Sequence, residues 1–287
     1  MKHILLLTAV ALCLLKNELP AQNFSIGFKA GQSFSRVEGA DATFTLPFVN
    51  KNVTPEGKLG FTGGISLSYE FLPMFGVQLE GVYAKKGAMY KDNFSLTSAM
   101  SGQLTPEFRQ LLPLLLGLMP PGSDSVKFSG DFTGEYIEVP LLFTFTPDFD
   151  FALKPSLYAG PNFAFLTNQS QNVQYESPLL DQPLQLPIPI PLPFPINLRD
   201  FLPPVHFALK DFDMGFTFGG GVAIDFLKSA SLGIEARYTI GFNSAVDSVG
   251  YGATSFAGFP IQPGSSQKDP DVKNRSLAVM GMLRYRF

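Results

Sequence analysis

The sequence predicts an all-β fold in which about eight antiparallel strands close into an up-and-down barrel that crosses a membrane. Three observations lead to this prediction. Apolar and polar residues alternate with a period of two along much of the chain, which indicates strands with two different faces. The connections between these stretches are short and long in turn. The last predicted strand ends on an aromatic residue, Phe287, with no polar tail after it.

Residues 1–22 have the layout of a secretory signal peptide. A short basic start is followed by the apolar run Ile4–Leu15 and by a cleavage site after Ala21. The apolar run is shorter than the roughly 20 residues that a transmembrane helix needs. We therefore interpret residues 1–22 as the signal-peptide region, cleaved after Ala21, and expect residues 23–287 to form one barrel domain.

Composition and single residues argue against several classes of function. The net charge of −3 argues against a nucleic acid as partner. The only cysteine, Cys13, lies inside the apolar run, so the mature chain is expected to lack disulfides and thiol chemistry. One histidine, His206, follows the signal peptide, and the sequence has no metal-binding cluster, phosphate loop or dinucleotide fingerprint. We expect no enzyme activity, no cofactor and no metal.

Each predicted strand places apolar residues at every second position. In the first, Phe24, Ile26 and Phe28 face one way and Lys29 faces the other. Every strand is near or above the roughly 9 to 11 residues that a membrane-spanning β-strand needs. In chain order the strands are Phe24–Ser33, Leu59–Phe71, Phe75–Lys86, Tyr136–Thr146, Phe151–Phe165, Phe212–Phe226, Leu232–Asn243 and Ser276–Phe287. Glycines 219–221, inside the sixth strand, are expected to accommodate barrel curvature or a bulky neighbour.

The connections alternate in length in the way that outer-membrane barrels do. Short connections surround Pro73, Asp148 and Ser229, whereas the long ones cover residues 36–57, 91–130, 168–210 and 245–274. In outer-membrane barrels the short turns are periplasmic and the long loops are extracellular. We therefore expect an eight-stranded barrel of the outer-membrane type, with long extracellular loops and both termini in the periplasm.

The last predicted strand is expected to close the barrel. An unpaired terminal strand would be an adhesive edge, and pairing with the first strand would remove that edge. Leu283, Tyr285 and Phe287 also match the aromatic carboxyl-terminal signal that the outer-membrane barrel-assembly machinery reads. Closure predicts that Phe287 faces lipid and that Arg284 and Arg286 face inward. The alternative is an ordinary terminal strand of a soluble sheet.

Short motifs along the whole mature chain resemble a known family. The motifs are Gly27–Gly31, Gln78–Glu80, Tyr83–Gly87, Tyr136–Leu142, Tyr158–Pro161, Gly219–Gly221, Glu235–Tyr238 and Arg284–Phe287. In this order they resemble the PorT-like, outer membrane protein β-barrel family of Bacteroidetes-type bacteria, often labelled porin family. The resemblance implies an outer-membrane barrel and allows a part in protein secretion of the type IX kind.

If the apolar faces meet lipid, the opposite faces fill the lumen with charged side chains. Six carboxylates and six cations have this orientation: Glu70, Glu80, Glu138, Asp213, Asp225 and Glu235, against Lys29, Lys86, Lys154, Arg237, Arg284 and Arg286. An eight-stranded barrel is just wide enough for side chains to fill it, and buried charges must be paired. We expect a closed, cross-linked polar plug. The alternative is a gated path for ions or solutes. A soluble lipocalin-like barrel would instead have an apolar interior.

Two loops have apolar sequences that could dock a partner. Residues 104–119 begin with a helix cap and continue with apolar residues that include Phe108, Leu112 and Leu115. This segment is expected to lie in the outer leaflet, to cover the barrel mouth or to bind a partner. A lid that packs on its own barrel rim is the simpler interpretation.

In the third loop every second residue from 187 to 195 is proline, which forbids a helix. The intervening Ile188, Ile190, Leu192 and Phe194 keep their N–H groups on one edge, so the segment is expected to extend the neighbouring hairpin or to act as a rigid spacer. Its apolar side chains suggest an interaction site.

Two functions follow from these observations. The first is a membrane-anchored structural and interaction platform with a closed lumen. Its expected partners are outer-membrane lipid, the barrel-assembly machinery and an outer-membrane protein bound through the apolar loops. The second is a small porin-like channel.

Overall fold

The computed structural model describes residues 24–39, 44–46, 51–95, 125–147, 149, 152–178, 205–251, 254–256, 259–262 and 265–287. The predicted signal peptide and the two candidate docking loops, with Phe108, Leu112, Leu115, Ile188, Ile190, Leu192 and Phe194, lie outside these residues. No helix in the described part of the chain has the length and apolarity needed to cross a membrane.

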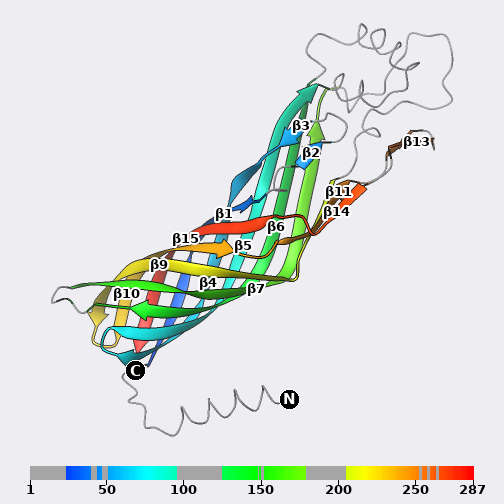
Figure 1. Cartoon of the computed structure of the whole chain (residues 1–287). Helices are drawn as coiled ribbons and strands as arrows, with labels where there is room; N and C mark the ends of the chain where they lie inside the picture. The colour runs from blue at the N-terminus through cyan, green and yellow to red at the C-terminus, as the bar shows by residue number, and fades with distance from the viewer. Residues whose placement is uncertain are drawn as a thin grey trace, which may run out of the picture.

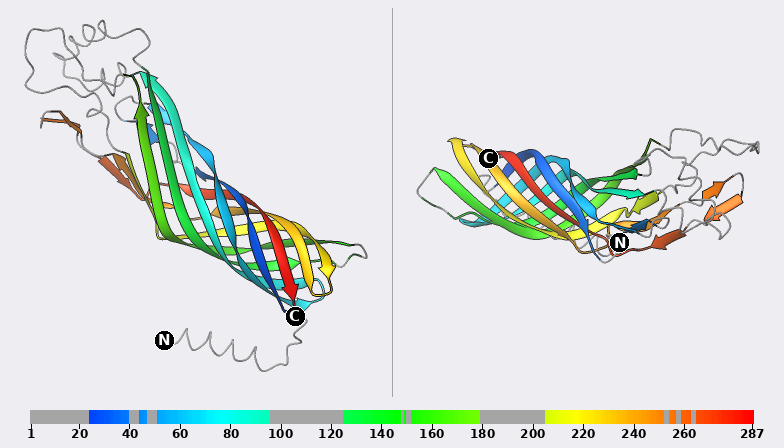
Figure 2. Two further views of the ribbon diagram at one scale, coloured as in Figure 1. Left: turned by 180° about the vertical axis from the view of Figure 1, so that it is seen from behind. Right: turned by 90° about the horizontal axis from the view of Figure 1, so that it is seen from above.

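Eight antiparallel strands form a closed barrel, as the sequence predicts (Figures 1 and 2). In chain order they are β1 (Phe24–Glu38), β4 (Pro55–Leu72), β5 (Phe75–Ser95), β6 (Ser125–Phe145), β7 (Leu153–Glu176), β9 (Phe212–Leu227), β10 (Ala230–Gly241) and β15 (Lys273–Arg286). Neighbours around the barrel follow the order β1-β15-β10-β9-β7-β6-β5-β4. The barrel closes between β1 and β15, where Ile26 pairs with Tyr285 and Phe34 with Leu277.

The remaining strands are short and form small sheets that are separate from the barrel sheet. They are β2 (Phe44–Leu46), β3 (Lys51–Val53), β8 (Val205–Leu209), β11 (Val246–Tyr251), β12 (Thr254–Phe256), β13 (Phe259–Gln262) and β14 (Ser265–Lys268). β14, β11 and β8 make a three-stranded sheet, whereas β2 pairs with β3 and β12 with β13. These strands correct the prediction that residues 245–274 and 168–210 are only loops.

The two ends of the barrel differ. At one end, called here the turn end, Pro73 and Met74 join β4 to β5, and Lys228 and Ser229 join β9 to β10. The carboxyl terminus lies at the same end (Figure 1). The opposite end, called here the loop end, has the small sheets (Figure 1).

β5, β6 and β7 rise above the other strands on one side of the loop end (Figure 1). They have 21, 21 and 24 residues, whereas β10 has 12 and β15 has 14. The upper parts of these three strands, Ala88–Ser95, Ser125–Gly134 and Gln169–Glu176, are called here the tall sheet. The prediction of loops over residues 91–130 and 168–210 was therefore wrong at both ends. In the tall sheet the outward positions are polar, such as Lys127, Ser129 and Thr133, so the alternation of apolar and polar residues that predicts a membrane strand disappears there.

Large apolar side chains cover the outside of the barrel wall. One such residue from each of the eight strands shows the extent of exposure, which is between 44% and 64%. These residues are Phe28, Leu67, Leu79, Phe143, Leu157, Phe218, Ile234 and Leu283. Aromatic pairs mark the turn end, such as Phe75 and Phe145 with ring centroids 5.2 Å apart. A continuous apolar outer band with aromatic residues at its edge is the surface that a membrane barrel presents to lipid.

Candidate functional site in the barrel lumen

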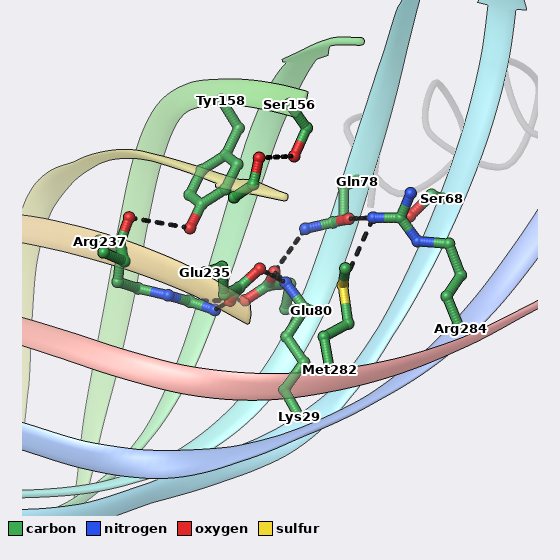
Figure 3. A network of polar contacts seen from close by, with 12 residues as sticks. Lys29, Ser68, Gln78, Glu80, Ser156, Tyr158, Glu235, Arg237, Met282 and Arg284 are labelled. Atoms are coloured by element: carbon green, nitrogen blue, oxygen red, sulfur yellow. Dashed lines mark hydrogen bonds and ion pairs between the residues drawn. The ribbon is translucent and has the colours of Figure 1, made fainter. Parts of the chain in front are cut away.

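Four charged side chains meet in the middle of the lumen (Figure 3). Lys29 Nζ lies 2.6 Å from Glu80 Oε1 and 2.8 Å from Glu235 Oε2. Arg237 Nη1 lies 2.7 Å from Glu80 Oε2, and its Nη2 lies 2.6 Å from Glu235 Oε1. Each cation therefore contacts both carboxylates, and we call this group the central ion ring. Its members are at most 4% exposed.

The central ion ring crosses the lumen because its members come from three strands, β1, β5 and β10, that are not neighbours in the barrel. A further layer of hydrogen bonds supports it. Gln78 Nε2 donates to Glu80 Oε1 at 2.5 Å, and Ser68 Oγ donates to Gln78 Oε1 at 2.9 Å. The Lys29 ammonium lies 5.8 Å from the ring centroid of Tyr158. Every charge of the ring is therefore paired, as buried charges must be, and of the Arg237 donors only Nε has no hydrogen-bond partner among the described residues.

Glycines on β9 leave room for the side chains of Tyr158 and Glu235 and for the backbone of β10. A Cβ on Gly219 would lie 2.3 Å from the Ala236 carbonyl oxygen and 2.9 Å from a ring carbon of Tyr158. A Cβ on Gly221 would lie 3.1 Å from Cβ of Glu235. These close approaches explain in physical terms why glycine occupies positions 219 and 221.

We expect Gly219→Ala to lower the free energy of unfolding by about 1–3 kcal/mol, because the added methyl group overpacks the lumen. Gly81→Ala is the matched control, since a Cβ on Gly81 would meet nothing within 4 Å. Urea unfolding in lipid vesicles, followed by circular dichroism, measures both changes. Equal stability of the two variants would contradict the steric role of Gly219.

A second group of charges lies nearer the loop end. Lys86 pairs with Glu138, and its ammonium lies 5.8 Å from the ring centroid of Tyr136. Asp213 is 4% exposed and accepts a hydrogen bond from Asn274 Nδ2 at 3.0 Å. Its other oxygen, Oδ1, has no hydrogen-bond partner among the described residues. The carboxylates therefore outnumber the cations at this level.

The remaining predicted lumen charges lie toward the turn end. Lys154 Nζ is 3.0 Å from Asp225 Oδ2, and Arg286 Nη2 is 4.0 Å from Asp225 Oδ1. Arg284 Nη2 lies 3.5 Å from Gln78 Oε1, and Glu70 is half-buried on β4. About a third of the Lys154, Asp225 and Arg286 side chains remains exposed. The structure thus brings together four of the twelve predicted residues in one ring and distributes the others above and below it.

An apolar core lies above these charges, and the sequence analysis did not identify it. On its tall-sheet side, Tyr90 is 2% and Phe132 is 6% exposed. Phe207 of β8 packs on them, with ring centroids 4.0 Å from Phe132 and 5.6 Å from Tyr90. The core consists of Tyr90, Phe132, Tyr136, Phe207, Leu209, Val246 and Val272, and it surrounds a cavity of about 30 Å³, enough for about one water molecule. Burial raises the pKa of Tyr90 well above its usual range, so the phenol is neutral.

Glutamine side chains attach β8 to the tall sheet. The backbone N–H groups of Leu209 and Phe207 donate to Oε1 of Gln169 and of Gln171, both at 3.0 Å. His206 lies beside them, with Nδ1 3.3 Å from Gln171 Nε2. In the described part of the chain no three His, Cys, Asp or Glu side chains are placed to hold a metal ion. The alternation in Val205–Leu209 was the only sequence signal of this element.

Comparisons with known proteins agree with a barrel. Residues 20–247 match the model of a family described as outer membrane protein beta-barrel domain. A search of curated proteins finds no match.

Similar solved structures include OprG from Pseudomonas aeruginosa, at 12% identity over 93% of this chain and 97% of that one, with a TM-score of 0.44. Neisserial surface protein A has 12% identity, coverages of 92% and 97%, and a TM-score of 0.39. The outer membrane protease OmpT from Escherichia coli has 10% identity, coverages of 95% and 99%, and a TM-score of 0.33.

Proposed function

Because the chain belongs to the outer membrane protein β-barrel domain family, we propose that it serves in the outer membrane as an anchored structural and interaction platform with a closed lumen. The central ion ring is the observation that carries this proposal. It spans the lumen with side chains from β1, β5 and β10, and its members are almost fully buried. Family membership accounts for the location in the outer membrane, whereas the closed lumen and the platform role are proposals.

Two barriers in series support a closed lumen. A solute that enters from the loop end first meets the apolar core of Tyr90, Phe132 and Phe207. Beyond it lies the central ion ring, where a passing ion would have to replace short contacts of 2.6–2.8 Å. Separating a buried ion pair is costly because each charge is left uncompensated. The geometry therefore favours a platform over a small porin-like channel.

The purified protein in planar lipid bilayers is expected to show no steady single-channel conductance. An open porin, reconstituted in parallel, shows that insertion and detection work. Steady openings of the wild-type protein would contradict the closed lumen and favour the porin-like channel instead.

We propose that the loop end faces the cell exterior and that both termini are periplasmic, because short turns are periplasmic in this class of barrel. The tall sheet would then stand above the membrane. Leu283, Tyr285 and Phe287, which are 45–58% exposed on the outer wall, would serve as the barrel-assembly signal. Protease access to the tall sheet in intact cells tests this orientation.

The partner-docking role of the apolar loops also stays a proposal. Crosslinking and affinity capture from native outer membranes, with and without residues 187–196, test it. Unchanged partners after the deletion would count against docking by that segment. Capture of protein-secretion components would support the type IX link that the PorT-like resemblance allows. The absence of enzyme activity stays a prediction.

A further inference from the structure

Two arginines lie directly opposite each other at the seam where the first and last barrel strands pair. Arg36 of β1 is the register partner of Arg275 of β15, and these strands lie side by side in Figure 2. Like charges in directly opposite positions of a sheet repel each other. The pair therefore needs a compensating anion.

One carboxylate of the chain compensates part of this charge. Glu38 forms an ion pair with Arg36, and its Oε2 lies 3.4 Å from Nε of Arg275. The neighbouring Lys273 and Asp271 neutralise each other at 3.1 Å. Two arginines against one glutamate leave one positive charge at the seam.

Both guanidinium groups keep donors for a further anion. Arg36 contacts Glu38 through Nη2, and more than half of its side chain is exposed. Arg275 donates from Nη1 to the Gly241 carbonyl at 2.7 Å and turns Nε toward Glu38. In the contacts of the described residues, Nε and Nη1 of Arg36 and Nη2 of Arg275 are thus unused. A planar guanidinium fork with free N–H groups suits the oxygens of a phosphate.

The height of this pair matches lipid headgroups. Phe34 and Leu277, each two residues nearer the turn end, face outward and are 44% and 48% exposed. A step of two residues moves about 7 Å along a strand, so the arginines lie just beyond the apolar band. On β5, two strands away from β1, outward-facing Lys85 pairs with Glu135 at 2.8 Å. That pair carries no excess charge, in contrast to the two arginines at the seam.

We propose that Arg36 and Arg275 bind the phosphate group of a phosphorylated membrane lipid in the leaflet at the loop end. The lipid chains would lie along the apolar wall below the pair, formed by Phe34 and Leu277. Glu38 would limit the affinity, because its carboxylate competes with the phosphate for the same guanidinium groups. This site depends on insertion in a membrane, but it does not depend on a closed lumen.

Electron spin resonance of spin-labelled phosphatidic acid tests the proposal, with the protein reconstituted in phosphatidylcholine vesicles. The protein is expected to retain phosphatidic acid about fivefold more strongly than phosphatidylcholine, since one basic residue near a membrane surface contributes about that factor. Arg36→Gln and Arg275→Gln should each remove most of this preference. Glu38→Gln should increase it by about fivefold, a change that a merely destabilised barrel would not produce.

The double variant Lys85→Gln with Glu135→Gln is the matched control, because it removes an outward-facing cation together with its partner and leaves the net charge unchanged. Heat-dependent migration in SDS gels shows that each variant is folded. No preference in the wild type, or an equal loss in the Lys85 and Glu135 double control, would overturn the proposal. Complete displacement of the lipid by excess inorganic phosphate at constant ionic strength would assign the site to free phosphate and would overturn the lipid assignment.

Discussion

Glu80→Gln is expected to lower the free energy of unfolding by about 3–5 kcal/mol, because removing one partner of a buried ion pair leaves the other charge uncompensated. Glu80 contacts Lys29 at 2.6 Å and Arg237 at 2.7 Å, and it accepts a hydrogen bond from Gln78. In the variant, two buried cations would share one carboxylate, Glu235. Urea unfolding in phosphatidylcholine vesicles, followed by circular dichroism, measures the loss.

Two further variants separate charge balance from general damage. Asp225→Asn changes a carboxylate that is about a third exposed near the turn end, so it should cost less than about 1 kcal/mol. The double variant Glu80→Gln with Arg237→Met restores a neutral ring and should recover part of the lost stability, because apolar replacements of buried ion pairs are often tolerated. If Glu80→Gln were as stable as the Asp225 control, the central ion ring would not be a major source of stability.

Phe132→Ala is expected to lower the free energy of unfolding by about 3–5 kcal/mol, the usual cost of removing a buried aromatic ring. Phe132 is 6% exposed and is the side chain through which β6 contacts Phe207 of β8. Its loss should loosen β8 and its neighbour β11 while leaving the central ion ring intact. Hydrogen exchange read by mass spectrometry should therefore accelerate in β8 and β11 and stay unchanged in β1 and β10.

Ser170→Ala provides the control for this variant. Ser170 is exposed on β7 in the same tall sheet, so the substitution should change stability by less than about 0.5 kcal/mol. If hydrogen exchange in β8 were as slow in Phe132→Ala as in the wild type, the glutamine contacts alone would be enough to hold β8 in place. Because the apolar core and the ion ring are separate barriers, we expect Phe132→Ala alone to remain closed in planar bilayers.

The barrel wall could be derived from the sequence because its signal is local. Phe28 is apolar and faces lipid, whereas its neighbour Lys29 is charged and faces the lumen. That contrast repeats at every second residue. The same reasoning predicted the closure of the last strand, and Phe24 O accepts a hydrogen bond from Phe287 N at 3.1 Å. The face opposite the apolar one then indicated which charged side chains would lie inside.

The tall sheet and the apolar core could not be derived in this way. Above the lipid the outward face of β7 carries Ser170, Asn172 and Gln174, so strand and loop have similar composition there. The inward face of β5 and β6 there is apolar at Tyr90 and Phe132, and Phe207 of β8 packs on both rings. That contact joins Phe132 to Phe207, two residues far apart in the sequence that only the folded chain brings together.

The amino-acid pattern alone therefore defined the wall, its apolar outside, its charged inside and its eight strands. Only the tertiary structure decided which charges pair. Lys29 contacts Glu235, which lies 206 positions away, because the register of eight tilted strands brings β1, β5 and β10 to the same height. Alternation is a property of neighbouring residues, whereas partners across a lumen are set by how the whole sheet closes.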